Sequence, residues 1–203
     1  MLELDHLIVG ASSLEAGVDY VREALGVTMP KGGAHPLMAT HNHVMLLGGG
    51  AYLEIIAPDT TIIPQRVRWF GLDYVARTPK LIGWAARVND LARALREIDG
   101  AKGEPIAMTR GDLEWRIGVP RDGSLSMEGA FPTLIQWPDW RLPQSRMSDL
   151  GCRLTRFEIS HPEGARISRA LATELRDERV QITTGEFNLR ALIDTPSGCR
   201  ELR

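Results

Sequence analysis

The chain has 203 residues, with 24 basic and 26 acidic side chains and a formal net charge of −2. This balance excludes an electrostatic case for nucleic acid or an anionic membrane surface as partner, and no apolar run approaches the roughly 18 residues of a membrane span. The two cysteines, Cys152 and Cys199, lack metal-ligand spacing, so neither a zinc site nor a disulfide framework is predicted. With no basic, apolar leader pattern at the start, we expect a globular cytoplasmic protein.

The first predicted strand, residues 2–10, carries one histidine among apolar neighbours. Alternation places His6 on one face with Leu4 and Ile8. Asp5 falls on the opposite face. An imidazole on an apolar face needs a partner, which is either a backbone carbonyl in a structural core or a ligand in a functional site.

A helix follows this strand. Ser12 and Glu15 form a capping-box pattern, and Gly26 supplies the stop. The apolar residues between them recur at helical spacing: Leu14, Val18, Val21 and Leu25.

Residues 27–36 read as a loop or an edge strand, and residues 40–47 and 51–57 read as a hairpin joined by three glycines. On the second of these strands Glu54 shares a mainly apolar face, where a carboxylate needs a cation, a metal or a raised pKa. Residues 59–80 give mixed signals, with one short helix or turn expected near 65–75.

The pattern then restarts, because Leu91 lies 77 residues after Leu14. Residues 81–88 predict a strand, and Asn89 or Asp90 predicts a helix cap. An apolar helical stripe follows at Leu91, Leu95 and Ile98, and a second hairpin is expected from residues 112–119 and 131–137.

A third round begins near Cys152. Residues 154–159 predict a strand, Ser160 opens a helix, and residues 180–183 and 187–193 predict two further strands. This tail reads as a βαββ segment that packs on the two repeated units or on a partner subunit.

Taken together, LDHLIVGASSLEAGVDYVREALGV, GGAHP, the Thr-x-Asn of the next strand, GGGAYLEIIAP and the later FPTLIQW resemble the glyoxalase-like branch of the vicinal oxygen chelate superfamily. The resemblance implies an α+β fold in which two βαβββ modules, about 1–60 and 80–140, share one cavity. We therefore expect a paired unit over residues 1–145 and an appended segment over 150–203. A ferredoxin-like sheet is the alternative, but it gives no reason for two long hairpins.

The resemblance also implies one divalent metal, held by a first-strand His and a last-strand Glu of each module. His6 and Glu54 match these positions in the first module, and Glu54 is the expected catalytic carboxylate. Gln136 falls at, or one step from, the corresponding position of the second module, where a carboxylate is usual. Gly83 stands opposite His6, so the fourth position departs from the pattern.

Residues for substrate binding are expected on the strands and loops around this cavity. His35 and Asn42 are implied by the resemblance, and His41 and His43 then point outward unless their loop folds inward. Aromatic and basic residues of the second module could hold a small carboxylate or an aromatic ring, although each also fits packing or a solvated face: Trp84, Trp115, Arg116, Arg121 and Trp137.

These features favour a metal-assisted enzyme of lyase, isomerase or dioxygenase type that acts on a small oxygenated metabolite. A binding protein of the same fold that sequesters a small molecule, and a protein with a vestigial cavity, remain open alternatives. The expected partner is a small molecule, with neither nucleic acid nor membrane, and a homodimer is left open.

Overall fold

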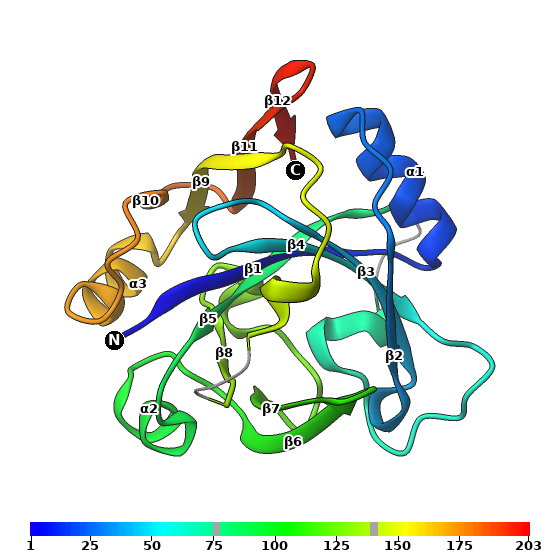
Figure 1. The fold of residues 1–203 in the computed structure, drawn as a ribbon. Helices are drawn as coiled ribbons and strands as arrows, with labels where there is room; N and C mark the ends of the chain where they lie inside the picture. The colour runs from blue at the N-terminus through cyan, green and yellow to red at the C-terminus, as the bar shows by residue number, and fades with distance from the viewer. Residues whose placement is uncertain (75–77, 139–141) are drawn as a thin grey trace.

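The computed structural model describes residues 1–74, 78–138 and 142–203. A curled eight-stranded sheet forms the centre of the molecule, and a four-stranded sheet packs beside it (Figure 1). The large sheet has the strand order β2-β3-β4-β1-β5-β8-β7-β6. In the described ranges, no helix combines the length and the apolar character that a membrane crossing requires.

The first module supplies one half of the large sheet. Its elements are β1 (Glu3–Gly10), α1 (Leu14–Leu25), β2 (Lys31–His35), the 3₁₀ turn η1 (Pro36–Met38), β3 (Thr40–Leu46) and β4 (Tyr52–Pro58). As predicted, β3 and β4 form an antiparallel hairpin, and β4 then pairs with β1 in parallel. The helix cap is Ser13 rather than Ser12, because the Ser13 hydroxyl accepts from the Ala16 N–H at 3.2 Å. Gly26 ends α1 in the left-handed conformation.

The second module repeats this plan. Its elements are β5 (Lys80–Arg87), α2 (Leu91–Glu97), β6 (Glu104–Arg110), β7 (Leu113–Val119), η3 (Ser126–Gly129) and β8 (Thr133–Gln136). Both β5 and α2 begin 77 residues after β1 and α1, and β8 pairs with β5 in parallel as β4 does with β1. The predicted β7–β8 hairpin pairs antiparallel, whereas the sequence does not predict β6, because it is an edge strand with only one buried residue and contains Pro105.

The two modules meet at the antiparallel pair β1–β5 in the middle of the sheet. The sheet curls so far that its edge strands β2 and β6 touch, which turns one face inward (Figure 1). Apolar side chains cover that inner face, among them Ile8, Ile56, Ile82, Ile117 and Ile135. Between β4 and β5 the described chain forms only η2 (Trp69–Tyr74), close to the expected position, and Val75 of the predicted 65–75 turn lies outside the described residues.

The C-terminal segment forms the second sheet, with the order β10-β9-β11-β12. Its elements are β9 (Arg153–His161), α3 (Gly164–Leu171), β10 (Val180–Thr184), β11 (Asn188–Thr195) and β12 (Gly198–Leu202), preceded by η4 (Pro143–Arg146). The segment is thus βαβββ rather than βαββ. Ser160 still belongs to β9, so the prediction that it opens the helix is wrong, and Glu163 occupies the cap position without a side-chain bond.

This second sheet shares a hydrophobic core with the outer face of the large one. Trp84 on β5 packs edge-on against Phe157 on β9, with ring centroids 5.9 Å apart. Backbone hydrogen bonds also join the two sheets. The Leu81 N–H donates to the Arg203 carbonyl at 2.7 Å, and the Leu2 N–H donates to the Glu174 carbonyl at 2.8 Å. The C-terminal segment is therefore hydrogen-bonded to the first residues of the central β1–β5 pair.

The cap of α2 gives a direct test of the second module. Asp90 accepts a hydrogen bond from the Arg93 N–H at 3.0 Å, so Asp90→Ala should lower the free energy of unfolding by about 1 kcal/mol. Asn89→Ala is the matched control and should change it by less than about half that amount. Urea denaturation of the two variants measures both effects. A larger loss for Asn89→Ala would contradict the assigned cap.

Candidate functional site

His6 and Glu54 lie on adjacent parallel strands and face the inside of the curled sheet. Glu54 on β4 stands opposite Ile8 on β1, two residues from His6. This register brings His6 Nε2 to 3.4 Å from Glu54 Oε2. Both side chains are buried, and His6 Nε2 has no hydrogen-bond partner among the described residues.

Asp5 belongs to the same cluster, which sequence alternation does not predict. The pairing of β1 with β5 shifts register between Leu4 and His6, so Asp5 is an extra residue in the strand. Its carboxylate contacts His6 Nδ1 at 2.7 Å and accepts from the Trp137 indole N–H at 3.1 Å. A second ionisable residue in so apolar a strand is the signal that could have identified it.

The remaining oxygen of Glu54 is also held. Asn42 on β3 donates from Nδ2 to Glu54 Oε1 at 2.5 Å, and its own Oδ1 accepts from the Gly33 N–H at 2.8 Å. Tyr52 stacks on the imidazole of His6 with ring centroids 4.5 Å apart. Asp5, Asn42 and Tyr52 thus fix the orientation of the His6 and Glu54 side chains.

His6, Tyr52 and Glu54 border a small cavity of about 20 Å³. Its wall consists of His6, His35, Tyr52, Glu54, Trp69, Phe70, Arg110, Trp115, Ile117, Ile135 and Trp137. This volume accommodates one water molecule or one ion rather than an organic substrate. Trp69 and Phe70 from η2, both buried, form part of the wall.

The electrostatics of the pair follow from this burial. Burial alone would lower the pKa of His6, but its contacts with Asp5 and Glu54 raise it to about 9. Burial alone would raise the pKa of Glu54, but the adjacent imidazolium of His6 and the Asn42 amide lower it to about 2. At neutral pH the metal-free protein therefore contains a buried His6 imidazolium that contacts both Glu54 and Asp5.

His35, to which the family resemblance assigns substrate binding, lines the same cavity but differs from His6 in charge state. Its Nδ1 is hydrogen-bonded to Thr40 Oγ1 at 3.1 Å. Burial lowers its pKa to about 4, against the opposing charge of Glu54. His35 is therefore a neutral imidazole at pH 7.

The structure does not bring Gln136 to this cavity. Its side chain lies on the outer face of β8, where Oε1 accepts from the Leu91 N–H at the start of α2. The register of β5 with β8 pairs Ala85 with Thr133, so Thr133 is the counterpart of Glu54. The second module thus presents Gly83 and Thr133 where the first presents His6 and Glu54.

Of the residues expected to bind substrate, some lie at the cavity and others lie elsewhere in the structure. His35, Asn42 and Trp137 join the cluster, although the Trp137 N–H is committed to Asp5. Trp84 is buried on the opposite side of the sheet, with its N–H donated to the Ala130 carbonyl. Arg116 lines an open groove of about 410 Å³ outside the cavity.

A divalent cation would find two protein ligands here, His6 Nε2 and Glu54 Oε2. No group of three His, Cys, Asp or Glu side chains in the described part of the chain is arranged to hold a metal. The pair nevertheless suits a cation in two respects. Asp5 contacts Nδ1 of His6, as carboxylates commonly do behind a metal-bound histidine, and Nε2 has no hydrogen-bond partner among the described residues.

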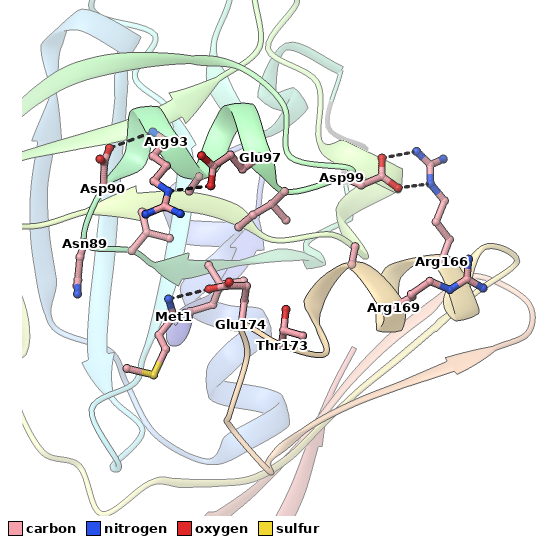
Figure 2. Close-up of a pocket in the computed structure, with 15 residues that line it drawn as sticks. Met1, Asn89, Asp90, Arg93, Glu97, Asp99, Arg166, Arg169, Thr173 and Glu174 are labelled. Carbon is pink, nitrogen blue, oxygen red and sulfur yellow. Dashed lines mark hydrogen bonds and ion pairs between the residues drawn. The ribbon is translucent and has the colours of Figure 1, made fainter.

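A further cavity, of about 620 Å³, lies between α2, α3 and the first residues of the chain (Figure 2). Most of its charges are paired within the protein: Arg93 with Glu97, Arg166 with Asp99, and the Met1 amino group with Glu174. None of the predicted site residues lines it. We therefore place the candidate site at His6 and Glu54.

The buried ion pair predicts a pH-dependent stability for the metal-free protein. Because the folded-state pKa of His6 is raised from 6.5 to about 9, the stabilisation is complete below pH 6.5 and is lost as the pH rises through 9. The free energy of unfolding should therefore fall by about 3 kcal/mol over that window.

Urea denaturation across the window measures this loss. Glu54→Gln keeps an acceptor for Asn42 but removes the anion, so it should flatten the profile. An unchanged slope in Glu54→Gln would show that His6 is not coupled to Glu54.

Comparison with known proteins places this architecture in a family. Residues 4–175 match the family model described as a glyoxalase-like domain. No curated protein matches the sequence. The crystal structure of a hypothetical protein from Staphylococcus aureus superposes with a TM-score of 0.60 at 14% identity, covering 84% of this chain and 74% of that one.

Structures of methylmalonyl-CoA epimerases are also similar at lower scores. The enzyme from Mycobacterium tuberculosis has a TM-score of 0.44 and 20% identity, over 68% of this chain and 89% of its own. A Streptomyces coelicolor enzyme in complex with 2-nitronate-propionyl-CoA has a TM-score of 0.45 and 16% identity, over 70% of this chain and 100% of its own. Since the family model spans most of the sequence, the chain belongs to the glyoxalase-like domain family.

Proposed function

We propose that this protein is a metal-assisted enzyme that acts on a small oxygenated metabolite at the His6–Glu54 cavity. The observation that carries the proposal is the buried Nε2 of His6, which makes no hydrogen bond and lies 3.4 Å from Glu54 Oε2 beside a space that fits one ion. An unsatisfied buried nitrogen costs free energy unless something binds it. A divalent cation satisfies it and also neutralises the adjacent carboxylate.

A site with only two protein ligands binds a metal ion weakly, and this limits which substrates can complete the coordination. Catalytic metal sites commonly offer three protein ligands and leave the remaining positions to water or substrate. With two, more of the coordination must come from the ligand, which favours substrates that present two neighbouring oxygens. When bound, the cation would supply Lewis-acid polarisation of those oxygens.

The chain's own groups would prepare this site. Asp5 holds the Nδ1 side of His6, so that the Nε2 lone pair of the neutral imidazole is directed to the cavity. Asn42 holds one oxygen of Glu54 and leaves the other directed at His6. Trp69, Phe70 and Trp115 line the space with apolar rings, and a low local dielectric constant strengthens electrostatic contacts inside it.

Metal analysis tests the proposal. Protein purified after growth with added Mn²⁺ or Zn²⁺ and then dialysed should bind one cation, and His6→Ala should abolish that binding. Gln136→Ala is the control, because Gln136 lies on the outer face of the sheet and its loss should leave metal content unchanged. Absence of saturable metal binding in the parent would instead favour a binding protein that sequesters a small molecule.

The raised pKa of His6 predicts that metal competes with a proton. Below pH 9 the imidazole is protonated in the metal-free protein, and a ligand His must be neutral. Apparent metal affinity should therefore rise about tenfold per pH unit between roughly pH 7 and 9 and level off above that range.

Calorimetry in buffers of different ionisation enthalpy should detect about one proton released per metal bound. An affinity that does not depend on pH would contradict binding through His6.

A further inference from the structure

The lining of the cavity includes two donor side chains that the proposed metal site does not use, Trp69 and Arg110. The indole Nε1 of Trp69 is buried and has no hydrogen-bond partner among the described residues. Arg110, at the end of β6, lines the same cavity, and its guanidinium forms no ion pair with any carboxylate in the described ranges. Arg110 is half-buried, but a buried donor without a partner, such as Trp69 Nε1, is rare in native proteins and points to an absent acceptor.

The positions of both side chains are determined by close packing. Trp69 stacks on Phe70 with centroids 5.0 Å apart and meets His35 edge-on at 5.1 Å. The stem of Arg110 crosses the seam between β6 and β2 at Gly33, where a Cβ would lie 2.7 Å from Arg110 Cδ. A residue larger than glycine at position 33 would therefore displace the guanidinium from the cavity.

We propose that Trp69 and Arg110 bind the carboxylate of the substrate, so that the enzyme acts on small carboxylic acids with a second oxygen beside the carboxyl group. This inference rests on the proposed function, since it places the other end of the substrate at His6 and Glu54. Trp and Arg side chains donate and cannot accept, so their common ligand is an oxygen acceptor. A carboxylate takes an Arg fork and an indole N–H as charge-assisted hydrogen bonds.

Binding requires the cavity to widen, and the backbone at Phe70 favours such a change. A space of about 20 Å³ is filled by one water, so a carboxylic acid must displace Phe70 outward while Trp69 keeps its contact with His35. Phe70 has φ 57°, a left-handed conformation that costs a residue with a side chain free energy. Relief of that strain offsets part of the cost of opening.

Pyruvate is the probe, because it carries a carboxylate beside a keto oxygen, and pyruvamide is its uncharged counterpart. Equilibrium titration followed by ligand-observed NMR should show saturable binding of pyruvate to the metal-free parent, and weaker binding of pyruvamide. Trp69→Phe, which keeps the ring but removes the N–H, and Arg110→Gln should each weaken pyruvate binding about tenfold or more. Arg116→Gln, an exposed arginine outside the cavity, should remain within about twofold of the parent.

Several outcomes would overturn the inference. They are no saturable pyruvate binding to the parent, equal affinity for pyruvamide, or parent-like affinity in both Trp69→Phe and Arg110→Gln. Metal titration of the same variants separates this result from the proposed function, because neither residue contacts the cation. Parent-like metal binding with unchanged pyruvate affinity would reject the carboxylate site and leave the metal site standing.

Discussion

The buried charge cluster of Asp5, His6 and Glu54 is the constraint on which the rest of the first module depends. A carboxylate or an imidazolium without partners would be strongly destabilising inside an apolar sheet. The bulge at Asp5, the Asn42 amide and the stacked Tyr52 all serve to satisfy these charges. The bulge at Asp5 and the polar residues Asn42 and Tyr52 on an otherwise apolar face are therefore explained by this one charge cluster.

The two modules share a backbone plan but divide the chemistry unequally. The first places ionisable groups on the inner face, whereas the second places Gly83 and Thr133 at the equivalent positions. The second module contributes aromatic walls instead, with Trp115 and Trp137 in tilted contact at 5.1 Å. The repeated plan thus forms a shared cavity in which the first module supplies Asp5, His6 and Glu54 and the second supplies aromatic walls and Arg110.

The repeat could be recognised from sequence because helix caps and apolar periodicity are local signals. The interval of 77 residues places β5 and α2 correctly, and His6 and Glu54 meet because parallel neighbours in one sheet bring aligned residues together. Asp5 was placed on the wrong face because a bulge depends on pairing with a distant strand, which alternation along one strand cannot reveal. Gln136 was assigned to the site for a similar reason, since the register of β8 against β5 decides which of its residues faces inward.

The contacts between the C-terminal segment and the central strands β1 and β5 affect how the chain folds. Leu81, at the head of β5, receives its backbone partner from Arg203, and α1 packs against β12. These contacts join segments separated by more than a hundred residues, so closing them is entropically expensive and late. During synthesis, the sheet that carries the charged centre would leave the ribosome with one of its faces uncovered, and it would depend on the last strands to cover it.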